Sequence, residues 1–446
     1  MSTFKTASDL GTFVYQKLLV SKVKGEKPSE NILKELFNVL FYASLSTEES
    51  DFVKVTVTLL SKEFRKSPSA NSTYDEARFF PFIEPIVLTE KSLIKLSKAA
   101  DPWSSSLAID YNENNELYIY GMIDQALHFQ SFLNYEREEK PNAPGIIQVM
   151  VEDVGVLNVI FDFEPIATLN KNELTRSYID VFKYGPIASF VRNNTSHLKR
   201  FTEDLIKNGK YKEFKIADWE DTIETLYIQS ICRILLKIKN YHHGGAIVIT
   251  NDFINDFVLK YKLTYDRLQV AQENFLSSSI LFDSVTMDLD RAEKSKKQFV
   301  PMEDYIDYAE SVDEILEIDE ELKGAVRFIS SLSCVDGLVV LSYQLNVQNF
   351  GTVIEQKFPP DEVWVSTTAR IGESIKAMDP KHLGTRHRSM FAYCNGNPDA
   401  LGFVISQDGE IRAVMKVGEK VVVWEHIKVH QYLKSKKILP FPPAKS

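Results

Sequence analysis

Three short apolar segments near the carboxyl end of the chain, separated by glycine turns, limit the possible folds more than any other feature. They lie in residues 399–427, whose sequence is DALGFVISQDGEIRAVMKVGEKVVVWEHI. Asp408-Gly409 and Gly418-Glu419 provide the two turns, because these dipeptides favour tight connections between strands. The run predicts three consecutive strands, the first of which ends at Ser406.

Helical and strand patterns alternate along the preceding part of the chain. Helices are predicted in residues 7–23 and 31–45. Strands are predicted around an Asn-rich turn in residues 105–124 and on both sides of a glycine in residues 144–169. A long amphipathic helix in residues 221–240 leads through a His-His-Gly-Gly turn into an apolar strand. This mixture indicates an α/β fold, and 446 residues with 44% hydrophobic content are enough for two or more domains.

The negative charge of the chain is concentrated in one segment. Residues Met302 to Leu322 hold ten acidic residues and no basic residue, which equals the net charge of -10 for the whole chain. The remainder is neutral overall, so no general nucleic-acid-binding surface is expected. The apolar residues of the segment recur near helical spacing, and we interpret it as a solvated helix that separates two regions.

Cysteine content and hydropathy predict a cytoplasmic protein that does not enter the membrane. The three cysteines, Cys232, Cys334 and Cys394, are far apart and match neither a metal-binding spacing nor a disulfide framework. No apolar stretch is long enough for a transmembrane helix, and the first ten residues lack the pattern of a secretion signal.

The sequence GTRHRS at residues 384–389 is the strongest candidate for a binding site. Thr385 is predicted to cap a helix whose first turn carries Arg386, His387 and Arg388. Helix N-termini favour acidic residues, so two arginines there suggest a ligand that supplies negative charge. The guanidinium groups and helix N–H groups would suit a triphosphate, although a solvated charge cluster is the alternative. A short helix is also predicted just before, in residues 368–378.

Two weaker signals accompany this candidate. Asp336-Gly337 stands at the start of a predicted strand, where a carboxylate next to a glycine can serve as a metal ligand or a base, although Asp-Gly is also a common turn. The pair His242 and His243 is followed by two glycines. Adjacent residues rarely bind one ion, so a plain turn is favoured there over metal binding or another ligand contact.

Taken in order, these motifs resemble the diadenylate cyclase (DAC) domain, a family that joins two ATP molecules into cyclic di-AMP. The resemblance rests on Asp336-Gly337-Leu338, on the block Gly384-Thr385-Arg386-His387-Arg388 and on Ser406, and covers about 135 residues from Tyr305 to Leu439. Residues 105–124 and 242–250 resemble, more loosely, the sensor modules that precede some bacterial DAC domains. The implied organisation is a sensor domain in residues 1–300, an acidic helical connector in 301–323 and a DAC-like mixed sheet flanked by helices in 324–440.

The resemblance also implies a role for each motif residue. Asp336 would hold a divalent metal, Mn²⁺ or Mg²⁺, and favour the deprotonated hydroxyl of the substrate. Thr385, Arg386, His387 and Arg388 of the second motif would bind the phosphates of ATP, and Ser406 would touch a phosphate oxygen. Gly337 would let the backbone approach the nucleotide, with Leu338 beside it. Each domain would hold one ATP, so the resemblance implies a homo-oligomer in which two domains face each other. The ligand of the sensor is not implied.

Three departures from the family pattern leave alternatives open. Leu338 stands where the family usually has Ala, residues 357–371 look like an insertion, and Gln407 replaces a common acid, although Asp408 follows it. One alternative is a degenerate domain that binds nucleotide without turnover. The other is a non-enzymatic interaction protein whose Arg-His-Arg cluster binds an acidic partner.

Overall fold

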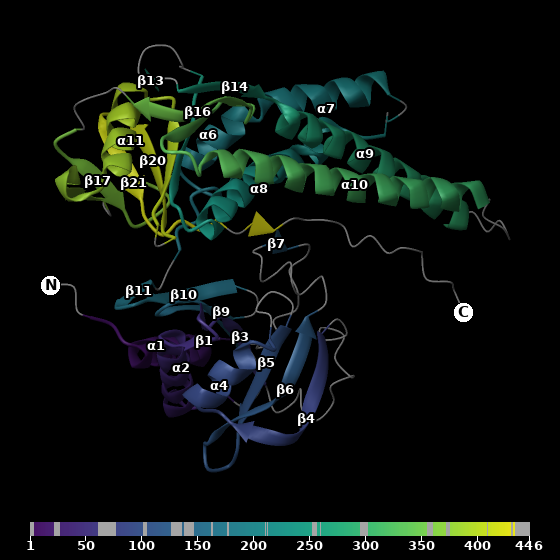
Figure 1. Ribbon diagram of the computed structural model, residues 1–446. Coiled ribbons are helices and arrows are strands. Elements are labelled where there is room, and N and C mark those ends of the chain that lie inside the picture. The colour runs from purple at the N-terminus through teal and green to yellow at the C-terminus, as the bar shows by residue number, and fades with distance from the viewer. Residues whose placement is uncertain are drawn as a thin grey trace. The chain divides into compact units, whose positions relative to one another are not determined.

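The computed structural model divides the chain into two compact units, Met1–Tyr178 and Ile179–Ser446, each of which is described by itself (Figure 1). The structure describes residues 4–21, 27–60, 77–100, 105–125, 136–137, 147–161, 164–175, 178–209, 211, 213–251, 257–258, 260–294, 302–354, 360–371, 375–407, 409–429 and 431–432. Among them, no helix combines the length and the apolar character needed to cross a membrane.

The first unit consists of a mixed sheet and helices that pack against it. Its sheet has the strand order β11-β10-β9-β8-β3-β5-β6-β4, in which β3 and β5 are parallel and the other neighbours are antiparallel. The elements are α1 (Ala7–Val20), α2 (Glu30–Ser44), β1 (Thr47–Glu48), β2 (Asp51–Phe52), β3 (Val55–Leu59), β4 (Ala77–Val87), α4 (Glu90–Ser97), β5 (Ser105–Tyr111), β6 (Leu117–Gln125), β7 (Glu136–Arg137), β8 (Ile147–Asp153), β9 (Val156–Phe161), β10 (Glu164–Asn170) and β11 (Glu173–Thr175).

Local sequence signals account for most of these elements. The α1 helix begins with a capping box between Thr6 and Asp9, and the Ser29 side chain accepts a hydrogen bond from the backbone at the start of α2. Gly155 adopts a φ of 70° in the turn between β8 and β9, as the predicted break in residues 144–169 requires. The helices predicted in residues 7–23 and 31–45 and the strands predicted in 105–124 and 144–169 are confirmed where the structure describes them, while residues 22–23, 144–146 and 162–163 lie outside the described residues.

The two faces of this sheet differ in chemistry. Helices α1, α2 and α4 share an apolar core with one face, which includes Val57, Leu107 and Val149. The opposite face of the same strands buries polar side chains. The Thr58 and Ser106 hydroxyls lie 2.8 Å apart, and the Gln148 amide donates to Thr58 over 3.0 Å. Because buried polar groups need partners, this pairing fixes the side chains on that face.

The second unit is built around a longer mixed sheet. Its order is β13-β16-β15-β12-β19-β20-β21-β17-β18, with β14 also paired to β16. Strand β12 is parallel to β15 and antiparallel to β19. The strands are β12 (Gly245–Ile249), β13 (Phe257–Val258), β14 (Tyr261–Tyr265), β15 (Leu338–Leu341), β16 (Val347–Ile354), β17 (Val363–Ser366), β18 (Ile375–Met378), β19 (Leu401–Ile405), β20 (Ile411–Val417), β21 (Lys420–Trp424) and, outside this sheet, β22 (Gln431–Tyr432).

Helices cover both faces of this sheet. On one face α11 packs Met390, Phe391 and Cys394 into a cluster with strand residues such as Val248 and Val404. On the other face a larger core joins α8 and α10 to alternate residues of the same strands. The helical elements are α6 (Pro186–Asn194), α7 (Ser196–Asn208), η1 (Ile216–Asp218), α8 (Glu220–Asn240), α9 (Arg267–Lys294), α10 (Met302–Leu332), η2 (Pro380–His382) and α11 (Thr385–Gly396). The α/β class is thus confirmed, as are the three predicted strands β19, β20 and β21.

The boundary between the two units does not coincide with the predicted connector in residues 301–323. The acidic segment is helical, as predicted, but it forms the first part of α10, which continues to Leu332. Strand β12 lies between β15 and β19, so residues that were assigned to the region 1–300 complete the sheet of the second unit. Long-range strand pairing, which local composition does not reveal, places the division after Tyr178.

The helix predicted in residues 368–378 is wrong for the described residues 368–371 and 375–378, while residues 372–374 lie outside the described part of the chain. Residues Ile375–Met378 form β18, which pairs antiparallel with β17 in the register Val363↔Met378. Strand β17 in turn lies parallel to β21, so the hairpin extends the sheet. Sheet pairing has overridden a local pattern that suited a helix.

Candidate functional site

Three segments that are distant in sequence meet at one edge of the second sheet. Because β12 and β15 are parallel neighbours, they begin at the same edge, and β19 ends there because it runs antiparallel to β12. The residues just before β12, just before β15 and just after β19 are therefore adjacent. They include His243-Gly244, Asp336-Gly337 and Ser406-Gln407, so two of the predicted motifs and the His-Gly turn share one location.

The first turn of α11 reaches the same edge. Its N-cap is Gly384, with φ -62° and ψ 164°, and Thr385 is the first helical residue, so the predicted capping role of Thr385 is wrong. A side chain placed at Gly384 would meet nothing within 4 Å, so the space around this end of the helix is open. The N–H groups of His387 and Arg388 both donate to the Gly384 carbonyl oxygen, over 3.1 and 3.2 Å, so those of Thr385 and Arg386 are the ones without an acceptor in the helix. This end of α11 therefore offers an accessible site for an anion.

Arg386 connects the converging segments. Its Nη1 donates to the carbonyl oxygen of His243 over 3.4 Å, and its Nη2 lies 3.8 Å from Oδ1 of Asp336. A side chain at Gly244, whose φ is 68°, would come within 2.9 Å of the guanidinium. The His-His-Gly-Gly sequence thus forms a turn, as favoured, and its glycine leaves room for Arg386.

Asp336 presents its carboxylate to solvent, with 88% of the side chain exposed. The next residue, Gly337, has a φ of 126°, and a side chain there would lie 2.4 Å from the backbone of Gly351. Only glycine fits this close approach between the start of β15 and β16. The backbone therefore fixes where Asp336 stands, while its oxygen atoms remain available to a ligand.

The described residues contain no cluster of three or more His, Cys, Asp or Glu side chains that could enclose a metal ion. A single exposed carboxylate can still bind Mg²⁺ or Mn²⁺ without an enclosing cluster. Such ions commonly bind one or two carboxylates, water and the phosphates of a substrate. Asp336 fits a metal ion that arrives with a nucleotide.

His387 points into the protein although it lies between two arginines in sequence. It is 9% exposed, and its Nε2 is 2.8 Å from Nη1 of Arg412 on β20. Arginine only donates hydrogen bonds, so Nε2 of His387 accepts, which makes the ring neutral. The structure gives His387 a place in the packing of α11, in contrast to the phosphate contact that the sequence suggested.

Arg412 belongs to a polar network that the sequence analysis missed. Its guanidinium contacts the carboxylate of Glu410 and donates from Nε to Glu425 over 3.1 Å. His426 lies 3.5 Å from Glu410. The one sequence signal was a basic residue inside the otherwise apolar start of β20, IRAV. Through Arg412, this network holds the first turn of α11 against the sheet.

The remaining predicted residues occupy different surroundings. Leu338 is 5% exposed and packs in the core beneath α11, so its side chain does not face the edge where the motifs meet. The Ser406 hydroxyl bonds the backbone of Glu410, which closes the turn between β19 and β20. Arg388 is exposed, as is Gln407. Asp408 lies outside the described residues.

Comparison with known proteins supports a sensor assignment for part of the first unit. Residues 22–124 match the family model described as "Probable sensor domain DACNV". This match includes the strands of residues 105–124, whereas residues 242–250, which were expected to belong to the same module, lie in the second unit. No curated protein and no solved structure matches the chain. The first unit thus contains a segment similar to the sensor domain of DAC proteins.

Proposed function

We propose that the second unit is a diadenylate cyclase that condenses two ATP molecules into cyclic di-AMP and releases two pyrophosphates. The observation that carries this proposal is the position of Arg386, which lies at the start of α11 between Asp336 and the backbone of His243. A guanidinium and the N–H groups at a helix start are donors for phosphate oxygens, and a carboxylate can hold the divalent metal that accompanies a nucleoside triphosphate. The match to a DAC-associated sensor domain in the first unit gives independent support.

The proposed chemistry requires positioning more than covalent participation by the protein. The 3′-oxygen of one ATP attacks the α-phosphorus of the other, the bond to pyrophosphate breaks, and the same step in the opposite direction closes the ring. Arg386, Arg388 and the first N–H groups of α11 bind phosphate oxygens and stabilise the charge that develops on them. His387, held by Arg412, positions the turn that carries both arginines.

A divalent metal bound to Asp336 and to the phosphates would lower the pKa of the attacking hydroxyl. Arg386, 3.8 Å from this carboxylate, keeps it beside the phosphates. Because each domain would hold one ATP, the reaction requires two domains that face each other about a two-fold axis. We propose that a ligand of the DACNV segment, in a cytoplasmic protein, regulates that assembly.

The proposal is tested with purified full-length protein, ATP and either Mn²⁺ or Mg²⁺. Cyclic di-AMP and pyrophosphate should form, and Asp336→Asn should lower the rate at least about 100-fold, the usual scale for loss of one transition-state stabiliser. Since Asp336 is exposed, the melting temperature should not change. Asp361→Asn is the matched control, because Asp361 is an exposed carboxylate outside the site. Equal product formation by folded Asp336→Asn and Asp361→Asn proteins would exclude this role of Asp336.

A nucleotide-binding domain without turnover is the second candidate, and Gln407 is the observation that favours it. Its backbone lies next to Gly244 at the site, at a position where the DAC family commonly has an acid. Leu338 gives this candidate little support. Its side chain is larger than the Ala usual in the family, but it is buried in the core. A thermal shift with ATP in the absence of product would favour binding alone. If ATP neither binds nor reacts, an interaction surface at Arg386 and Arg388 is the remaining function.

A further inference from the structure

The acidic segment of the sequence lies on the helix that leads directly to Asp336. Helix α10 ends at Leu332, and backbone hydrogen bonds continue the turn as far as Val335: Ser333 N–H donates to Ser330, Cys334 to Ser331 and Val335 to Leu332. The next residue is Asp336. Because residues 333–335 form a hydrogen-bonded turn between α10 and Asp336, a shift of α10 along its axis would move this carboxylate.

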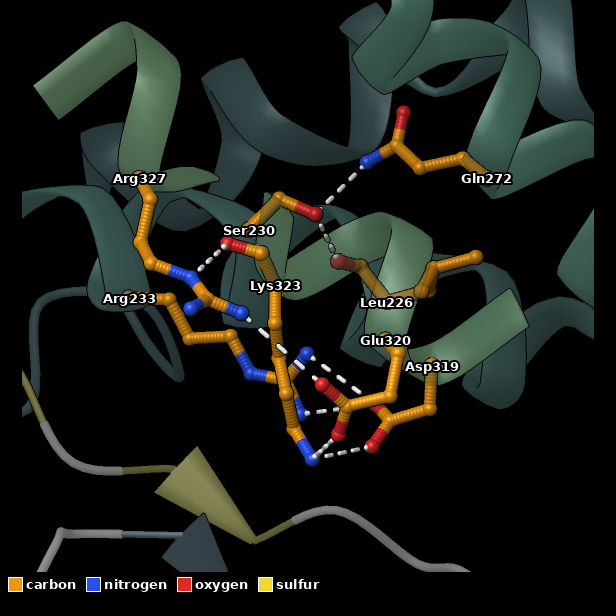
Figure 2. Close-up of polar contacts among 8 residues, drawn as sticks. All are labelled: Leu226, Ser230, Arg233, Gln272, Asp319, Glu320, Lys323 and Arg327. Atoms are coloured by element: carbon orange, nitrogen blue, oxygen red, sulfur yellow. Dashed lines mark hydrogen bonds and ion pairs between the residues drawn. The ribbon is translucent and has the colours of Figure 1, made fainter. Parts of the chain in front are cut away.

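One ion pair fixes α10 to α8 from within the protein (Figure 2). Both terminal nitrogens of Arg233, on α8, donate to Oδ1 of Asp319, on α10, over 3.4 Å. The Arg233 side chain is only 8% exposed. Removing the carboxylate partner of a buried guanidinium is strongly unfavourable, so the pair disfavours any register of α10 in which Asp319 lies elsewhere.

Asp319 contacts a second basic residue, Lys323, in addition to Arg233. Lys323 donates to Oδ2 of Asp319 over 2.8 Å and to Glu320 over 2.9 Å. Burial lowers the pKa of Lys323, but its hydrogen bonds to Asp319 and Glu320 outweigh burial, and the pKa is raised. Asp319 is 29% exposed and Glu320 is 65% exposed. The two adjacent acids therefore differ, because Asp319 accepts from Arg233 on α8, whereas Glu320 contacts Lys323 and Arg327 on its own helix.

Helix α9 holds the same segment of α10 by further contacts. Arg267 donates to Glu321 over 2.9 Å, and the Ser278 hydroxyl donates to Glu314 over 2.9 Å. Gln272 on α9 donates to Ser230 on α8 over 2.8 Å, one turn before Arg233 (Figure 2). Part of the acidic sequence is thus used for contacts between helices, in addition to the solvated face that the sequence suggested.

We propose that Arg233 and Asp319 are positioning residues, which set the axial register of α10 on α8 and so place Asp336 beside Arg386. This inference rests on the proposed cyclase function. A slip of one helical turn would displace Asp336 by about 5.4 Å, and misplacement of a reacting group by about 1 Å can cost about 100-fold in rate. Buried ion pairs often add little net stability, and in some proteins they specify one arrangement of the fold, which is the role proposed here.

The test compares Asp319→Asn with Glu320→Gln, which each remove one negative charge from adjacent positions. In the full-length protein, Asp319→Asn should raise the Mn²⁺ concentration for half-maximal cyclic di-AMP synthesis at least about 10-fold, because the metal-binding carboxylate is misplaced. Glu320→Gln should match the parent. A simple loss of folded protein would lower the rate without changing the half-saturating Mn²⁺ concentration. Equal half-saturation in both variants would overturn the inference.

Two further measurements keep the inference testable if a variant or the activity fails. Should Asp319→Asn not fold, Arg233→Met removes the other member of the pair, and a folded Arg233→Met protein with the half-saturating Mn²⁺ concentration of the parent would overturn the inference. Should the parent make no cyclic di-AMP, the proposed function fails, and hydrogen exchange decides the positioning role by itself. Amides of residues 333–338 should then exchange faster in Asp319→Asn but not in Glu320→Gln.

Discussion

His387 and Arg386 are neighbours in sequence but face different surroundings. Successive residues of a helix point about 100° apart, so a side chain that reaches the open end of α11 is followed by one that turns toward the sheet. Arg386 contacts Asp336, whereas His387 contacts Arg412, a residue 25 positions later. The sequence revealed the cluster of charge, but it could not show which member was buried, because the partner comes from another strand.

The buried position of His387 predicts a loss of stability more than of turnover. His387→Ala would leave the Arg412 guanidinium without one acceptor, at 15% exposure of that side chain, and should lower the free energy of unfolding by about 1–3 kcal/mol. His387→Gln, which can present an acceptor, should lose less. Denaturant unfolding beside turnover per folded molecule measures both quantities. A large loss of turnover with unchanged stability would instead return His387 to a phosphate-binding role.

At the scale of elements, predictions succeeded where a signal within the segment specified its secondary structure. They failed where pairing with a distant strand determined the structure. Helix α2 and the strands β5 and β6 follow from caps, turns and periodicity within each segment. Residues 375–378 were assigned to a helix, but they pair with β17, which no local pattern reveals. The site shows the same limit. Asp336 and Arg386 were identified as motifs, whereas Glu410 and the His243 carbonyl enter the site only through the sheet.

Helices α8 and α11 each bury a cysteine, and this predicts how the protein responds to alkaline pH. Burial raises the pKa of Cys232 well above its ordinary value, and burial raises the pKa of Cys394 to about 12, against a partial lowering by a hydrogen bond with Gly402. The unfolded thiols lose their protons first. The free energy of unfolding should therefore fall as the pH rises from about 9 to about 12.

Thiol labelling gives a direct measurement of the same feature. At pH 8 a maleimide should modify Cys334, which is exposed, and leave Cys232 and Cys394 unmodified until the protein is denatured. Mass spectrometry of peptides identifies the labelled position. Rapid modification of Cys394 in the folded protein would show that α11 opens from the sheet more readily than its packing indicates.

For the whole molecule, the position of β12 decides where the chain can be divided. Because β12 pairs with β15 on one side and β19 on the other, a fragment of residues 301–446 would lack an internal strand of its sheet. That fragment should show no cooperative thermal transition by circular dichroism. A fragment of residues 179–446 retains the second unit and should melt cooperatively. A cooperative transition in the shorter fragment would contradict this view of the unit.

The same strand has a consequence for biosynthesis. β12 is an apolar pentapeptide, GAIVI, and its partner β19 is translated about 150 residues later, which takes roughly 10–30 s at the usual speed of a ribosome. During that interval β12 has an unpaired edge, and such edges are prone to aggregate in nascent chains. We therefore expect the nascent chain to bind a ribosome-associated chaperone between the synthesis of β12 and the emergence of β19 from the ribosome.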